Sequence, residues 1–330
     1  MTATTTSTTS GGAAPARRRR RGRLTFDRIS FFLVFLGVPL AIYITFVVSP
    51  FIQAFYYSLL EWGGFSGDMT FIGLQNYVTL FHDDLFLKAM RNNIVLAIVL
   101  PLVTITLSII LATLITVGGA SHGQIRGIAG AGFYRVVSFF PYVIPGVIIG
   151  IIWGAMLDPS SGLIPGFMKW ILGVDYWDGH LGNPHTAMPW AIFVIVWAFV
   201  GFYTLLFIAA IKGIPAEVYE AVRLDGAGRF RTAVSITIPM IRENVQTAWI
   251  YLGIVALDAF VYMASLFPGS SPDNSTLVMS QQLYMTAFIQ GKFGLASAMG
   301  VVLAIMTLIF AGLVFGVNRL LGGKDSGGYE

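Results

Sequence analysis

A polar segment, residues 212–243, lies between two long apolar runs. Here the acids Glu217, Glu220 and Asp225 stand close to the base Arg223. Carboxylates and a guanidinium in contact with water can form ion pairs and charge-assisted hydrogen bonds with another protein. The segment is therefore predicted to be a contact surface for a soluble partner, although an amphipathic connector between two helices explains the same residues.

One ionisable residue, Asp258, lies near the middle of a long apolar segment. A carboxylate at the centre of a bilayer costs about 2.5–3.5 kcal/mol, so its side chain is expected to face a bundle interior or water. Tyr251, Asp258 and Tyr262 are seven and four residues apart, which predicts one helical face. Such a face suits a polyol, with Tyr203 and Trp153 as further candidates for the solute pathway. The alternative for Asp258 is a structural role, capping or cross-linking helices.

Other kinds of chemistry have few residues to carry them. The sequence contains no Cys, which excludes disulfides, thiolate metal sites and a Cys nucleophile. The histidines His82, His122, His180 and His185 occur singly, without the spacing of metal ligands. We therefore predict no catalytic residue, no cofactor-binding residue and no metal ligand in this chain.

The apolar composition of the chain indicates which secondary-structure elements carry the candidate functional residues. Of the 330 residues, 56% are hydrophobic and 11% are charged, against roughly 25% charged in soluble domains. A helix needs roughly 20 residues to cross a bilayer. Six apolar stretches are long enough: 29–60, 94–117, 136–157, 188–211, 246–267 and 297–320. Because backbone groups in lipid must bond within their own segment, the sequence predicts an all-α, polytopic integral membrane protein with six transmembrane helices.

The distribution of Lys and Arg predicts the orientation of these helices. Basic residues are concentrated in the N-terminal tail, in the segment between the second and third apolar stretches, in residues 212–245 and in the C-terminal tail. The intervening segments hold only Lys88, Arg91, Lys169 and Lys292. The positive-inside rule therefore places both termini and the 212–245 loop in the cytoplasm of a bacterial cell, with the chain crossing the inner membrane.

The chain is predicted to have three regions. Residues 1–28 form a disordered, basic cytoplasmic tail, residues 29–321 form the six-helix membrane domain with its loop 212–245, and residues 322–330 form a C-terminal tail. The arginine run of the first tail is expected to lie on anionic membrane lipid, and not to bind nucleic acid.

Local signals predict two short helices in the 212–245 loop. Pro215 can open the first, because the N–H that it lacks would have no intrahelical partner there. Gly226 can end it, because glycine adopts positive φ without strain. A second helix is expected from about Arg229 to just before Pro239.

The same loop resembles the EAA loop of ABC importer permeases. The matching residues are Glu220-Ala221-Val222, Asp225-Gly226-Ala227 and Ile236-Thr237-Ile238-Pro239. Further matches to sugar permeases of the maltose-transporter type are FIGLQNY at 71–77, FFPYVIP at 139–145, IPAE at 214–217, DGAG at 225–228, PDNST at 272–276 and FGLASA at 293–298. Residues 257–262, LDAFVY, resemble the family's F-D-x-x-Y stretch. The resemblance covers nearly the whole chain.

This resemblance implies a type I ABC importer transmembrane fold and the function of a carbohydrate permease. It implies four kinds of partner: a second homologous permease subunit, two ATPase subunits, an extracytoplasmic sugar-binding protein and the transported carbohydrate. The residues implied to couple the chain to the ATPase are Glu217, Glu220, Ala221, Arg223, Asp225, Gly226, Ala227 and Pro239. The chain has no phosphate-binding loop of the G-x-x-x-x-G-K-[ST] type, so ATP and Mg²⁺ are expected to be used by the separate ATPase.

Two other classes of protein remain as alternatives. The first is an ion-coupled secondary transporter of a small polar solute, for which repeated halves and more polar groups in the membrane would be expected. The second is a membrane scaffold that transports nothing. The sequence does not identify the sugar or its length. A related permease that transports glycerol 3-phosphate remains an alternative.

Overall fold

The computed structural model describes residues 30–65, 67–117, 130–174 and 176–322, and divides into two units, 1–53 and 54–330. The predicted tail 1–28 lies outside the described residues, as do residues 323–330 of the predicted C-terminal tail. Each unit is described by itself.

The first unit contains most of a single apolar helix, Ser30–Tyr57, whose last residues belong to the second unit. Its segments are η1 (Leu33–Gly37), α2 (Val38–Tyr43), η2 (Ile44–Val48) and α3 (Ser49–Tyr57). Both π-helical turns, η1 and η2, end two residues before a proline, at Pro39 and at Pro50. Proline cannot donate the helical hydrogen bond and its ring crowds the carbonyl four residues back. A wider turn just before it relieves that crowding, so the helix continues past both prolines.

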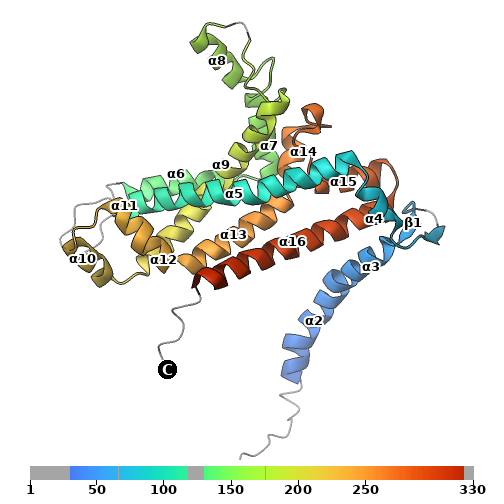
Figure 1. The fold of residues 1–330 in the computed structure, drawn as a ribbon, viewed down its shortest axis with the longest axis horizontal. Coiled ribbons are helices and arrows are strands. Elements are labelled where there is room, and N and C mark those ends of the chain that lie inside the picture. Colours follow the sequence, from blue (N-terminus) through green and yellow to red (C-terminus); the bar gives the residue numbers. More distant parts are fainter. Residues whose placement is uncertain (1–29, 66, 118–129, 175, 323–330) are drawn as a thin grey trace, which may run out of the picture. The chain divides into compact units, whose positions relative to one another are not determined.

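The second unit is almost entirely helical (Figure 1). In chain order its elements are β1 (Leu60–Trp62), β2 (Met69–Phe71), α4 (Gln75–Leu80), α5 (Asp84–Val117), α6 (Ala131–Val143), α7 (Gly146–Met156), α8 (Leu163–Leu172), α9 (Pro184–Lys212), α10 (Ala216–Leu224), α11 (Arg229–Thr232), η3 (Ala233–Thr237), α12 (Ile238–Met240), α13 (Arg242–Leu257), α14 (Phe260–Leu266), η4 (Pro272–Asn274), α15 (Met279–Tyr284), η5 (Met285–Ile289) and α16 (Phe293–Gly322). The exception to the all-α prediction is the antiparallel hairpin β1–β2, in which Leu60 pairs with Phe71.

The described helices are compatible with six membrane spans. Four of them are long and apolar enough to cross a bilayer: Ser30–Tyr57, α5, α9 and α16. Two further spans result if each of the bent pairs α6–α7 and α13–α14 is counted as one. The bends are 95° and 48°, respectively, so each of these two spans is an interrupted helix.

The break between α6 and α7 follows from Pro145. A proline disfavours helical backbone angles at the residue before it, and Ile144 is extended, with φ −76° and ψ 129°. Pro145 then caps the start of α7. The two helices therefore meet at nearly a right angle. Pro101, by contrast, lies within α5, which stays one helix.

The core of the second unit is built around α5 and α9. Helix α5 packs along α9 and α13, α6 lies against α9, and α7 lies against α14. Small residues allow the closest approaches, as is usual between membrane helices. A Cβ atom on Gly201 of α9 would lie 1.6 Å from the Ser138 carbonyl oxygen of α6.

Alanine at position 201 is expected to destabilise the folded protein by about 1–3 kcal/mol, because the contacting atom is backbone and cannot rotate away. Gly312 of α16 is the matched control, since a Cβ there would meet no atom within 4 Å. Thermal melting of the detergent-purified protein measures the difference. Equal melting temperatures for Gly201→Ala and Gly312→Ala would contradict the close packing of α6 on α9.

Candidate functional site

The first helix of the 212–245 loop forms as the sequence predicts. Helix α10 follows Pro215, whose carbonyl accepts from the Val218 N–H at 3.2 Å. After the helix, Gly226 has φ +70° and the Ala227 N–H donates to the Val222 carbonyl at 3.2 Å. This is the glycine-dependent turn that commonly ends helices. The start at Pro215 and the stop at Gly226 are both confirmed.

The second helix does not end before Pro239, so that prediction was wrong. Segments α11, η3 and α12 follow one another, and the helical backbone continues to Met240. The π-helical turn η3 ends two residues before Pro239, as η1 and η2 do before their prolines. The wider turn accommodates the proline ring, so the helix passes through it.

Helix α10 is attached to the membrane helices through Tyr219. The Tyr219 side chain is 3% exposed, and its hydroxyl lies 3.2 Å from Thr237 Oγ1 in η3. Burial raises the pKa of Tyr219, and the hydrogen bond with Thr237 acts in the opposite direction. Tyr219 also belongs to an apolar cluster with Ile115 of α5 and Phe207 of α9. Tyr219 thus packs α10 against α5 and α9.

The other face of α10 is open to solvent. Glu217, Glu220 and Ala221 are exposed, and Glu217 lies in the first turn, where a carboxylate is favourable for the helix dipole. Leu224, at the end of the helix, is 89% exposed. The sequence analysis identified neither the exposed Leu224 nor the anchoring Tyr219. The position of Leu224 on the polar face of an amphipathic helix could have indicated its exposure.

The remaining residues of the predicted coupling set are distributed over the loop. Arg223 is in α10, Asp225 and Gly226 are exposed in the turn, and Ala227 is half-buried. Pro239 is exposed on α12. Six exposed members of the set thus belong to one continuous loop: Glu217, Glu220, Ala221, Asp225, Gly226 and Pro239.

The helix that carries Asp258 is interrupted at that residue. Helix α13 ends at Leu257, Asp258 has φ −109° and ψ 51°, and α14 begins at Phe260. The prediction that Tyr251, Asp258 and Tyr262 share one face of a single helix was therefore wrong: Tyr251 is on α13, Asp258 is in the break and Tyr262 is on α14, after a bend of 48°. In this chain Tyr251 is 62% exposed, Asp258 is exposed and Tyr262 is half-buried.

The other two predicted pathway residues are packed inside the unit. Tyr203 is 4% exposed and lies edge-on to Phe202. Trp153 is half-buried and meets the ring of Trp197 at a centroid distance of 5.5 Å. The five residues differ in exposure, and their assignment to a solute pathway stays a prediction.

Comparison with known proteins decides the class of this chain. Residues 115–323 match the family described as binding-protein-dependent transport system inner membrane component. The chain belongs to this family. It is an ABC transporter permease of the inner membrane and not an enzyme, and the ion-coupled alternative has no support.

Two relatives match over most of their length. The chain is 57% identical over 307 residues to the diacetylchitobiose uptake system permease NgcF of Streptomyces coelicolor, covering 92% of this chain and 87% of that protein. It is 34% identical over 272 residues to the probable ABC transporter permease YurN of Bacillus subtilis, covering 82% of this chain and 90% of that protein.

Solved structures confirm the fold. A chain of a bacterial alginate ABC transporter, solved in complex with an alginate-bound periplasmic protein, superposes with a TM-score of 0.74. The match covers 89% of this permease and 96% of that chain, at 23% identity. The predicted all-α ABC importer transmembrane fold is therefore correct.

Proposed function

We propose that this permease forms half of the translocation pathway of an ATP-driven importer whose solute is a short carbohydrate of the diacetylchitobiose class. One observation supports this substrate above others: the 57% identity to the diacetylchitobiose permease NgcF, which extends over 92% of the chain. The sugar-uptake permease MsmF of Streptococcus mutans, at 30% identity over 82% of the chain, agrees with a carbohydrate substrate in general.

The proposed assembly pairs this chain with a second homologous permease, two ATPase subunits and an extracytoplasmic sugar-binding protein. The ATPase subunits use ATP and Mg²⁺, and the permease holds neither. The exposed face of α10, with Glu217, Glu220 and Leu224, enters a groove of one ATPase. Tyr219 transmits the movement of that subunit to α5 and α9, which changes the pathway between inward-open and outward-open states.

The proposed orientation places α10 and both termini in the cytoplasm. Two observations support it. The basic residues gather in the segments that this orientation places inside, and α10 lies at one end of the second unit while the hairpin β1–β2 lies at the other (Figure 1). The hairpin end would then lie on the extracytoplasmic side of the membrane.

Uptake of radiolabelled diacetylchitobiose tests the proposal. Cells that express this permease with its partner permease, ATPase and binding protein are expected to accumulate the sugar. Accumulation should stop when the phosphate-loop Lys of the ATPase is replaced, and should continue when an uncoupler removes the proton gradient. Labelled glycerol 3-phosphate is the comparison solute. Uptake of that solute alone would refute the carbohydrate assignment, and uptake that follows the proton gradient would refute the ATP-driven mechanism.

A further inference from the structure

A buried amide of α5 meets the broken helix at Asp258. The Asn93 side chain is 0% exposed, and its Nδ2 donates to the carbonyl oxygens of Ala256 at 3.3 Å and Leu257 at 2.9 Å. Its Oδ1 accepts from the Met279 N–H at 2.7 Å. One side chain thus joins the end of α13 to the start of α15.

These two carbonyls require such a donor. A helix that ends at Leu257 leaves its last carbonyl groups without intrahelical N–H partners. In a membrane no bulk water replaces them, and an unbonded carbonyl is costly. The amide of Asn93 takes over from the missing helical N–H groups, so the interrupted conformation around Asp258 depends on it.

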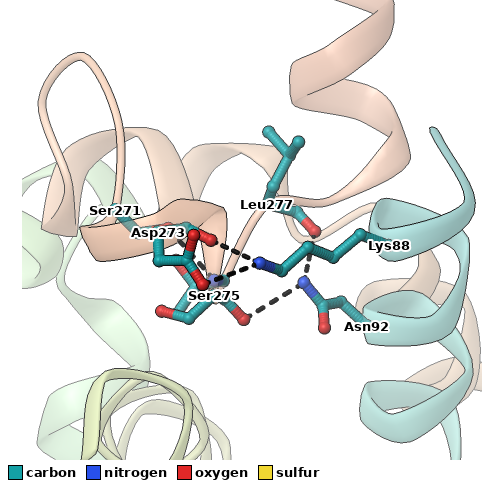
Figure 2. A network of polar contacts seen from close by, with 7 residues as sticks. Lys88, Asn92, Ser271, Asp273, Ser275 and Leu277 are labelled. Atoms are coloured by element: carbon teal, nitrogen blue, oxygen red, sulfur yellow. Dashed lines mark hydrogen bonds and ion pairs between the residues drawn. The ribbon is translucent and has the colours of Figure 1, made fainter. Parts of the chain in front are cut away.

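Helix α5 also binds the segment that precedes α15. Lys88 Nζ donates to the Asp273 carboxylate at 3.1 Å and also to its carbonyl oxygen. One turn further along α5, Asn92 Nδ2 donates to the carbonyls of Ser275 at 3.1 Å and Leu277 at 2.8 Å (Figure 2). Asp273 has φ +50°, a left-handed conformation that residues other than glycine seldom adopt, so these contacts hold an otherwise unfavourable turn.

We propose that Asn93 is a positioning residue for transport: it fixes the direction in which the break presents Asp258 and ties that break to the segment leading into α15. Lys88 and Asn92 tie the preceding turn to the same helix. A shift of the 271–279 segment is then transmitted through α5 to Asp258. This inference rests on the proposed solute pathway, and it concerns residues that the coupling loop does not include.

Asn76 offers a matched control for testing Asn93. It is also a buried asparagine, 7% exposed, and its Nδ2 donates to the carbonyls of Ser58 and Leu60 at 2.9 Å each. Asn93→Leu and Asn76→Leu therefore remove the same kind of interaction, and both should lower the melting temperature of the assembled transporter. Only Asn93→Leu is expected to raise the apparent KM for diacetylchitobiose, by about tenfold.

A second measurement is independent of transport. Because the chain has no Cys, a single Asp258→Cys replacement reports the exposure of the break through its rate of maleimide labelling in the assembled complex. Adding Asn93→Leu is expected to change this rate about fivefold or more, whereas adding Asn76→Leu should leave it unchanged. The labelling rate can be measured even if the wild-type transporter does not import diacetylchitobiose. Failure to import that sugar would refute the substrate assignment alone, and not the role of Asn93.

If the complex with Asn93→Leu does not assemble, Asn93→Asp is the variant to use for the same two measurements. It keeps the Oδ1 acceptor for Met279 and leaves at most one O–H donor, that of a protonated carboxyl, in place of the two amide N–H groups that face Ala256 and Leu257. A change in labelling rate and apparent KM with this variant supports the proposal. If Asn93 and Asn76 variants lower stability alike while labelling and KM stay at wild-type values, Asn93 is a structural residue only and the proposal is overturned.

Discussion

Proline at position 226 is expected to reduce sugar uptake to the background of cells that lack the permease. Gly226 has φ +70°, and proline is restricted to about −65°. The turn after α10 must therefore open, at a cost of about 3 kcal/mol or more, which lowers the population of the native loop about 100-fold. The measurement is the amount of ATPase that co-purifies with Gly226→Pro, together with uptake.

Asparagine at the same position is the control that isolates backbone geometry. It tolerates left-handed backbone angles better than other residues with a side chain, and a Cβ at position 226 would meet no atom within 4 Å. Gly226→Asn should therefore retain most ATPase binding and uptake. If Gly226→Pro binds and transports as well as Gly226→Asn does, the loop 212–245 is not the coupling element.

Helix α10 could be predicted because its limits are determined locally. Pro215 and Gly226 act on the backbone through their own covalent structure, so a pattern of neighbouring residues is sufficient. Pro239 shows the limit of the same reasoning. Its ring would end a regular α-helix, and the local sequence does not indicate that η3 widens the turn before it.

The break at Asp258 could not be predicted, because no proline or glycine marks it. It is stabilised by Asn93, which donates to the Leu257 carbonyl across a sequence separation of 164 residues. A period of seven and four residues indicates a shared face only while the helix is continuous. Tertiary contact therefore decided the geometry of the candidate pathway, whereas local chemistry decided that of the coupling loop.

Replacing Asp258 with asparagine is expected to raise the apparent KM for sugar uptake by about 10- to 100-fold while the complex assembles normally. A hydrogen bond to a charged group contributes about 1.5–3 kcal/mol, and the amide keeps the shape of the side chain while removing the charge. Because Asp258 is exposed in this chain, the substitution leaves no cavity in the core. Uptake kinetics and co-purification of the partner subunits measure the two effects.

The outcome for Asp258→Asn separates its two possible roles. If the carboxylate only held helices together, the variant would melt at a lower temperature or lose its partners, and the KM of the remaining transporter would not change. If it contacts the solute, the KM rises and stability does not fall. Asp68→Asn, at an exposed acid before β2, controls for the loss of one negative charge and should leave both measurements unchanged. A normal KM for Asp258→Asn would remove this residue from the pathway, and with it the reason for expecting solute at the break between α13 and α14.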